Sequence, residues 1–311
     1  MKKIFALITV IAVIFFITGC GADKVESVPD KLFAIIDDDI GRKIYLEKKP
    51  ERIAVTSASF LEPLHEVGGN VVGRPDSKNN MPDWAKNISS VGHVYQIDVE
   101  KLLACTPDLV ILNKGMNEKL LNVLDENQIP ALVLDMKTYD DVKREVKIFS
   151  QLTGNVERGE EIINGMDTEI KNILDNTPKK NLRVAILHST AQGLTVQLDG
   201  SIAGNIVKMF GWENVAAGMT PLENNPDAAP YSMETLAAQN PDVIFVTSMG
   251  NVDEIKSNIE KSFAENSAWQ VIDAVKNNRV YYLPQDLFLL SPGLRYPEAV
   301  RFIGILIDTE K

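Results

Sequence analysis

The chain reads EKLLACTPDLVI at residues 100–111 and ETLAAQNPDVIF at residues 234–245, and these two stretches decide its fold. Glu, Leu, Ala, Pro and Asp recur at the same offsets, and an apolar run follows the Asp in both copies. Each copy predicts a short helix that ends at a Pro-Asp turn and leads into a buried strand. Continuous apolar strands such as 109–112 and 243–246 are typical of a parallel sheet covered on both faces. The repeat therefore predicts two lobes of similar α/β construction.

Strand and helix signals alternate around each copy. In the first half the pattern predicts strands at 52–56, 71–73 and 131–134 and helices at 61–67 and 118–126. In the second half it predicts strands at 183–187 and 280–283 and a helix at 202–210. Between the halves, an apolar stripe at helical spacing runs from Val156 to Asp175, and twenty residues make a rod of about 30 Å. We therefore expect two Rossmann-like lobes joined by a single long α-helix, a stiff connection that permits little hinge closure.

Composition narrows the class of protein. The 311 residues carry 32 basic and 43 acidic side chains, which gives a formal net charge of −11, and 45% of the residues are hydrophobic. This is the composition of a soluble globular protein with room for two domains. The acidic balance argues against nucleic acid as a partner, because phosphate neutralisation needs clustered Lys and Arg. Two cysteines, Cys20 and Cys105, are too few for a disulfide framework, and Cys105 is expected to be a small core residue.

The N-terminus has the pattern of an export signal. Lys2 and Lys3 precede an apolar run at residues 4–18, and fifteen residues span only about 22 Å as a helix, short of the ~30 Å bilayer core. The run ends in ITGC at residues 17–20, which resembles a bacterial lipobox, and this implies lipidation of Cys20 and anchoring to the outer face of the cell membrane. The alternative is an ordinary secretory signal with an incidental cysteine.

These features predict five segments. They are a signal peptide at 1–19, a lipidated tether at 20–30, an N-terminal lobe at 31–155, a connecting helix at 156–178 and a C-terminal lobe at 179–311.

Three further motifs accompany the lipobox, the long helix and the repeat: DIGR at 39–42 before PERIAV at 50–55, GWENV at 211–215 and SPGLR at 291–295. In this order they resemble the substrate-binding lipoproteins of ABC importers for ferric siderophores, heme and cobalamin. The resemblance spans roughly residues 31 to 307. It implies a monomer that binds an iron complex or a corrinoid in a cleft between the lobes and delivers it to a permease dimer with its ATPase subunits. Heme, siderophore or cobalamin would be the transported ligand and not an intrinsic cofactor.

Four loops at strand ends are candidates for the cleft wall. They contribute the candidate ligand-binding residues Ser59, Phe60, His93, Tyr95, Met249, Arg295 and Tyr296. A phenolate is a hard donor suited to Fe(III) and a neutral imidazole is a second donor, so Tyr95 and His93 are the candidate metal ligands. The Arg295 guanidinium suits ligand carboxylates. Ordinary interpretations of the same residues stay open: Ser59 as a helix cap, His93 as an exposed side chain, Tyr95 as a packed side chain and Arg295 as a surface charge.

The pattern departs from that of the Gram-positive heme-binding lipoproteins of this family. Those proteins usually place a Met five residues before the first-lobe Glu and a His after the second-lobe strand. Here Tyr95 and, approximately, Met249 hold these places. A Tyr-centred heme site, with His93 or Met249 as the second iron ligand, stays open, and so does a siderophore or cobalamin ligand.

Glu100 and Glu234 open the two repeated helices. A carboxylate in a first helical turn is favoured by the helix dipole alone. In the cobalamin-binding member of the family, however, the Glu at each matching place meets arginines of the two permease subunits. The resemblance therefore implies that Glu100 and Glu234 are the transporter-docking points.

Other function classes fit less well. The sequence has no Gly-x-Ser-x-Gly elbow, no Gly-rich phosphate loop with a Lys and no paired-His zinc motif, so we expect no enzyme. The three histidines, His65, His93 and His188, lie far apart in the sequence. A zinc- or manganese-binding lipoprotein of an ABC importer remains one alternative, and an envelope hydrolase remains another.

Overall fold

The computed structural model describes residues 32–77, 81–190 and 193–308. The predicted signal peptide and tether, including Cys20, lie outside the described residues. Residues 32–311 form one compact unit. Within the described ranges, no helix is both long enough and apolar enough to cross a membrane.

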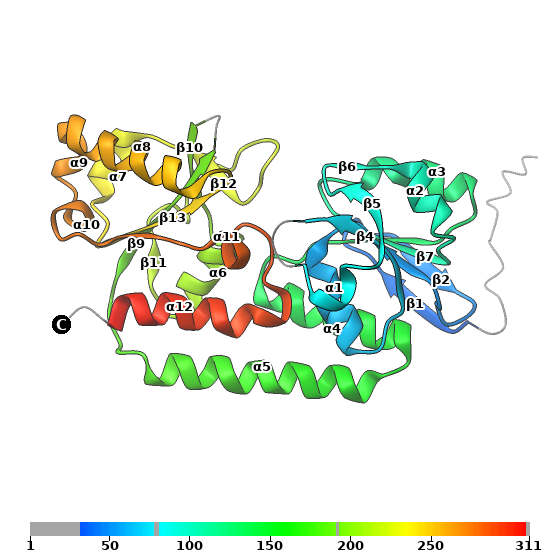
Figure 1. Cartoon of the computed structure of the whole chain (residues 1–311). Helices are drawn as coiled ribbons and strands as arrows, with labels where there is room; N and C mark the ends of the chain where they lie inside the picture. Colours follow the sequence, from blue (N-terminus) through cyan, green and yellow to red (C-terminus); the bar gives the residue numbers. More distant parts are fainter. Residues whose placement is uncertain (1–31, 78–80, 191–192, 309–311) are drawn as a thin grey trace, which may run out of the picture. The chain divides into compact units, whose positions relative to one another are not determined.

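The first lobe is built on a six-stranded sheet with the order β6-β5-β4-β3-β7-β8 (Figure 1). All of its strands run parallel except β6, which pairs antiparallel with β5 at the edge. The strands are β3 Ile53–Val55, β4 Val71–Asp76, β5 Ser89–His93, β6 Gln96–Ile97, β7 Leu109–Asn113 and β8 Ala131–Leu134. The helices are η1 Ala58–Phe60, α1 Leu61–Glu66, η2 Asp83–Ala85, α2 Val99–Ala104, η3 Glu118–Leu120, α3 Leu121–Glu126 and α4 Tyr139–Thr153. A separate hairpin pairs β1 Ala34–Asp37 with β2 Lys43–Leu46.

The second lobe has a mixed sheet with the order β12-β10-β9-β13-β14, and β11 pairs with β9. Its strands are β9 Arg183–Thr190, β10 Gly193–Gln197, β11 Glu213–Asn214, β12 Ala228–Pro230, β13 Val243–Ser248 and β14 Val280–Tyr282. Its helices are α6 Ile202–Met209, α7 Met233–Gln239, α8 Val252–Glu265, α9 Ser267–Gln270, α10 Asp273–Lys276, α11 Gln285–Phe288, η4 Gly293–Arg295 and α12 Tyr296–Asp308. The antiparallel strands β10 and β12 depart from a purely parallel lobe. The reason is local: β10 starts three residues after β9 ends, too close for the crossover that a parallel pair needs.

The repeated sequence folds the same way in both lobes. In each copy a short helix, α2 or α7, leads through the Pro-Asp turn into a fully buried stretch of strand, β7 or β13. The residue before the proline, Thr106 or Asn240, takes a left-handed conformation, with φ of 45° and 40°. The prediction of a helix, a turn and a buried strand is confirmed in both places.

The turn aspartate of each copy reaches back to the first strand of its lobe. Asp108 accepts hydrogen bonds from the backbone N–H groups of Glu51 (2.8 Å) and Arg52 (2.9 Å). Asp242 accepts one from the N–H of Arg183 (2.8 Å). The arginine at each of these places then donates to carbonyls at the end of the repeated helix: Arg52 to residues 105 and 106, and Arg183 to Gln239. We call each Arg–Asp set a clasp, because it ties the helix, the turn and the first strand together.

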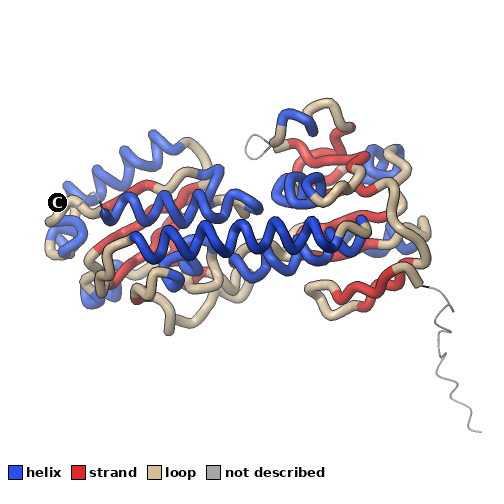
Figure 2. The backbone as a smooth tube through the Cα atoms, turned by 90° about the horizontal axis from the view of Figure 1, so that it is seen from below, coloured by secondary structure: helices blue, strands red, loops and turns tan. Residues whose placement is uncertain are grey.

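Helix α5, Val156–Asn176, runs along both lobes, as the spacing of apolar residues predicts (Figures 1 and 2). Its first half packs against α4 of the N-terminal lobe and its second half against α12 of the C-terminal lobe. One hydrophobic core follows this helix and includes residues of both lobes, among them Phe60, Tyr139 and Tyr296. The lobes are therefore joined by a continuous packed layer as well as by the chain. Cys105 is buried, as predicted.

Candidate functional site

A cavity of about 370 Å³ lies where strand ends of the two sheets face each other. Its wall includes Ser57 after β3, Asn113–Met116 at the end of β7, His188 near the end of β9 and Met249 after β13. Ligands of α/β folds bind in crevices at the carboxyl ends of strands, and this volume falls in the usual range of small-molecule sites. We assign the candidate site to this cavity, which we call the interlobe cavity.

Three side chains with the chemistry of iron ligands share this wall. Tyr95 and Met249, both predicted from the sequence, line it and are 55% and 43% exposed. His188 lines it as well. His188 directly follows the strand predicted at 183–187, but it is not among the ligand residues predicted from the sequence.

His188 is held in the form that binds metal. Its Nδ1 lies 2.9 Å from Thr247 Oγ1, and that hydroxyl donates to the Leu187 carbonyl (3.2 Å). Because the hydroxyl has only one proton, we assign the proton of the ring to Nδ1, which leaves the Nε2 lone pair as the acceptor. Burial also lowers the pKa of His188, so the neutral ring is favoured. A neutral imidazole with an oriented N–H is the usual state of a histidine metal ligand.

The charged groups in the wall cross from one lobe to the other. Lys137, after β8, forms ion pairs with Asp227 of the second lobe (2.6 Å) and with Asp135 (3.3 Å). Burial acts to lower the pKa of Lys137, but the hydrogen bond to Asp227 and the charge of Asp135 raise it overall. Burial raises the pKa of Asp135. Lys114 also lines the wall and is exposed.

A second, larger cavity of about 800 Å³ adjoins the first. The hydrogen bond from Ser59 Oγ to the Ser291 carbonyl (2.9 Å) marks their shared border, because both residues line both cavities. Arg295 and Trp84 lie in the wall of this second cavity. The Arg295 guanidinium binds both carboxylate oxygens of Glu298 (2.7 and 2.8 Å) and also Asp286 (3.0 Å). Hydrogen bonding to Glu298 is the main cause that raises the pKa of Arg295.

The remaining predicted ligand residues lie elsewhere. Phe60 and Tyr296 are fully buried in the shared core, and Tyr296 donates a hydrogen bond to Asn205 (2.8 Å). Tyr296 therefore begins α12 inside the core, and like Phe60 it is not among the described residues that line either cavity, contrary to the prediction. His93 is exposed at the end of β5 and is not among the described residues that line the interlobe cavity, although Tyr95 is. Of the predicted residues, the structure brings together Ser59, Tyr95 and Met249 in one wall.

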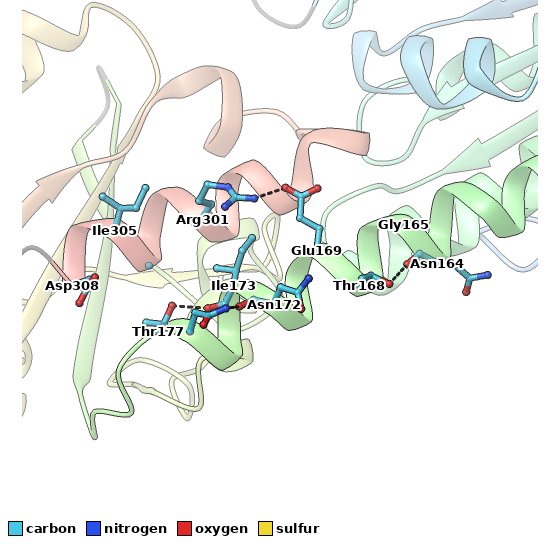
Figure 3. Close-up of a pocket in the computed structure, with 12 residues that line it drawn as sticks. Asn164, Gly165, Thr168, Glu169, Asn172, Ile173, Thr177, Arg301, Ile305 and Asp308 are labelled. Carbon is cyan, nitrogen blue, oxygen red and sulfur yellow. Dashed lines mark hydrogen bonds and ion pairs between the residues drawn. The ribbon is translucent and has the colours of Figure 1, made fainter.

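A third hollow, of about 810 Å³, lies between α5 and α12 (Figure 3). Figure 3 shows it bordered by polar side chains such as Asn164 and Thr168 and by the ion pair between Arg301 and Glu169 (2.6 Å). It is larger than the interlobe cavity, but it lies between two helices, away from the strand ends. We therefore place the site in the interlobe cavity, where the strands of both lobes converge.

The two predicted docking glutamates are both presented to solvent. Glu100 lies in the first turn of α2 and Glu234 in the first turn of α7, and both are exposed. The backbone N–H of Glu234 and the Ser232 hydroxyl bind its carboxylate and lower its pKa. Figure 1 shows α2 and α7 on the side of the molecule away from α5, one helix in each lobe.

In the parts of the chain that the structure describes, no three His, Cys, Asp or Glu side chains gather in a group that could hold a metal ion. The geometry thus gives no support to a site for a bare zinc or manganese ion in these parts.

Comparison with known proteins settles the family. A family model described as "Periplasmic binding protein" matches residues 53–287. The chain belongs to this family. It is a substrate-binding protein of the ABC-importer type, not an enzyme.

Individual relatives agree with this assignment. "High-affinity heme uptake system protein IsdE" of Staphylococcus aureus (strain Newman) is 28% identical over 269 residues, which cover 84% of this chain and 88% of that protein. An ABC transporter substrate-binding protein from Listeria monocytogenes EGD-e has a similar structure, with a TM-score of 0.74 and 25% identity over 83% of this chain and 98% of that one. Staphylococcus aureus SirA complexed with staphyloferrin B has a TM-score of 0.71 at 20% identity, covering 88% of this chain and 98% of that one, and this likeness shows the fold alone.

Proposed function

We propose that this protein captures heme in the interlobe cavity and delivers it to the permease dimer of an ABC importer. The observation that carries the proposal is the presence of Tyr95, Met249 and a neutral His188 in one cavity wall. A phenolate, a thioether and an imidazole are all established axial ligands of heme iron. The 28% identity to a protein named for heme uptake supports the same ligand.

Charge favours heme over a highly anionic siderophore. The ionised groups of the wall are Lys114, Lys137, Asp135 and Asp227, whose formal charges cancel. Among the described residues that line the cavity there is no arginine, the side chain best suited to several carboxylates at once. A flat apolar ring system with two carboxylates needs less positive charge than a polyanion. Apolar contacts come from Met116, Met136, Phe288 and Leu289 in the same wall.

Cobalamin is the second candidate, favoured by amide groups in the wall. Asn113, Gln197, Asn224 and Asn225 all line the cavity. The Oε1 atom of Gln197 is buried and has no hydrogen-bond partner within the described part of the chain. A buried acceptor favours a ligand that brings donors, as the side-chain amides of a corrinoid do.

Titration of the purified protein with hemin, a ferric siderophore and cobalamin tests the ligand class. We expect a Soret band to develop with hemin at a one-to-one ratio. Tyr95→Ala and His188→Gln should each change the band position and weaken binding by about tenfold or more, since an iron ligand is lost. His93→Gln is the matched control, because it removes an exposed imidazole near Tyr95 that does not line the cavity. Binding of cobalamin with no response to hemin would overturn the heme assignment in favour of the second candidate.

Bound zinc or manganese without a chromophore would instead favour the metal-ion alternative, and turnover of esters or peptides the envelope hydrolase.

The proposal includes a lipid anchor at Cys20 on the outer face of the cell membrane. It rests on the lipobox at residues 17–20. Cys20→Ala should abolish acyl labelling and release the protein from the membrane fraction, whereas Cys105→Ala should do neither. Unchanged labelling and retention of the Cys20 variant would contradict the anchor.

A further inference from the structure

Two lysines, Lys114 and Lys137, line the interlobe cavity. They differ in whether carboxylates of the protein already pair with their ammonium groups. Lys137 lies between Asp227 at 2.6 Å and Asp135 at 3.3 Å. Two of its three N–H donors are thus directed to carboxylates of the protein. These three residues together carry a formal charge of −1, so this part of the wall repels a ligand carboxylate.

Lys114 has no such partner. It is exposed, and no ion pair or side-chain hydrogen bond joins its ammonium group to any residue that the structure describes, although its charge acts on the Asp39 carboxylate and works against the rise in the pKa of that group on burial. The acid nearest along the chain is Glu118, and its carboxylate accepts the backbone N–H of Gly115 at 2.5 Å. Asp39 is itself paired with Arg144 (2.7 Å), so the positive charge of Lys114 remains available to a ligand.

The backbone that carries Lys114 is fixed. Its own N–H donates to the Leu134 carbonyl of the neighbouring strand (2.9 Å). Gly115 follows with φ of +81°, a conformation that glycine adopts without strain, and the N–H of Met116 closes the turn on the Asn113 carbonyl (3.3 Å). A fixed backbone reduces the ordering that binding requires, although the side chain itself must still be positioned.

We propose that Lys114 selects ligands that carry a carboxylate, by forming an ion pair with one carboxylate at the rim of the interlobe cavity. The selection deepens the proposed function and rests on it: for heme, the carboxylate is a propionate. Lys114 also brings the formal charge of the wall from −1 to zero. Its removal thus costs both the ion pair and the charge balance that lets an anion approach.

Parallel titrations with hemin and with hemin dimethyl ester, which lacks both carboxylates, test this role. Lys114→Gln should weaken hemin binding by about tenfold, the scale of a lost charged hydrogen bond, and leave the affinity for the ester unchanged. Lys114→Arg should restore most of the hemin affinity. Lys119→Gln is the matched control, because it removes an exposed lysine of η3, five residues along the chain and outside the cavity wall.

The outcomes separate the two claims. Unchanged hemin binding by Lys114→Gln, equal losses for hemin and its ester, or an equal loss in Lys119→Gln would overturn the role of Lys114 while leaving the heme assignment intact. Wild-type protein that binds neither porphyrin would overturn the proposed function itself. A loss confined to hemin, to Lys114→Gln and to low salt supports the selection, because added salt screens an exposed ion pair.

Discussion

The two lobes share one repeated unit but present different chemistry to the cavity. Strand β7 of the first lobe has five residues, and β13 of the second has six. The turn glycine after each strand, Gly115 or Gly250, has a positive φ, and the residue just before it lines the cavity. That residue is Lys114 in one lobe and Met249 in the other. The repeat thus fixes where the wall residues lie, while the residue types at these places are not repeated.

Strands β3 and β9, which pair with β7 and β13, also carry different side chains at matching places. Val55 of β3 pairs with Ile111, and Ile186 of β9 pairs with Phe245, at matching places of the two repeats. Two residues further along each first strand come Ser57 and His188, and both line the cavity. A duplicated scaffold with different side chains gives a cavity that has a cation on one side and the imidazole on the other.

The largest difference that the comparison predicts concerns the transporter. If each lobe docks through its own glutamate, Glu100→Lys with Glu234→Lys should abolish import and the stimulation of the transporter's ATPase, because two attractive contacts become repulsive. Each single variant should lose part of the activity. Ligand affinity should stay near wild type, since neither side chain lines the cavity.

Glu126→Lys, at the exposed end of α3, provides the control for a charge reversal elsewhere on the first lobe. Normal uptake by the Glu100/Glu234 double variant, at normal expression, would contradict the docking assignment.

The next effect concerns the contact between the lobes. Asn205 of α6 accepts hydrogen bonds from the N–H of Tyr139 in the first lobe (3.1 Å) and from the hydroxyl of Tyr296 (2.8 Å). Asn205→Ala should lower the free energy of unfolding by about 2–3 kcal/mol, because two donors on the buried residues Tyr139 and Tyr296 lose their acceptor. Because one core spans both lobes, urea unfolding should remain a single transition in wild type.

Asn176→Ala is the control and should change stability little, because within the described residues the Asn176 amide donates only to the Asn172 carbonyl on the surface of α5. Two separate transitions in the wild-type protein would show that the lobes unfold independently, contrary to the shared core.

The clasps predict a smaller difference between the lobes. Asp108 holds two backbone N–H groups and Asp242 holds one. We therefore expect Asp108→Ala to lower the free energy of unfolding by about 1–2 kcal/mol and Asp242→Ala by about 0.5–1 kcal/mol. Urea denaturation of the two variants measures both. The reverse order would mean that burial at Asp242 outweighs the number of hydrogen bonds at Asp108.

The clasps also show what the sequence does and does not predict. Local signals placed the repeated helix, the turn and the strand, because the proline, the turn aspartate and the apolar run act over a few neighbouring residues. The contacts of Arg52 and Arg183 could not be predicted from local sequence, since each arginine contacts a helix end more than fifty residues away. The antiparallel direction of β10 and β12 was not predicted for a related reason. Strand direction depends on the connection between strands and is not a property of the strand itself.

The sequence likewise predicted some residues of the site correctly and missed or misplaced others. Tyr95 and Met249 follow strand ends, so the parallel-sheet rule brought them to the cavity. His188 lies near the end of β9, so the same rule applies to it. Phe60 and Tyr296 follow the same kind of loop but lie in the core, since each begins or adjoins a helix that packs on the layer shared by the lobes. The sequence gives no signal that separates Lys114 from Lys137, because the difference between them depends on the contact of Lys137 with Asp227, 90 residues away along the chain.

The smallest predicted effect concerns the left-handed residue before each proline. Thr106 adopts φ of 45°, which is unfavourable for a β-branched side chain, whereas Asn240 tolerates φ of 40° at the matching place. Thr106→Asn should therefore stabilise the protein by about 0.5–1 kcal/mol, measured by urea denaturation. The reciprocal Asn240→Thr should cost more than this gain, because Asn240 also exchanges two hydrogen bonds of 2.8 Å with Asp273. Equal and opposite effects would mean that backbone conformation alone distinguishes the two turns. A loss of stability in Thr106→Asn would mean that the threonine makes a favourable contact there that outweighs its strained φ.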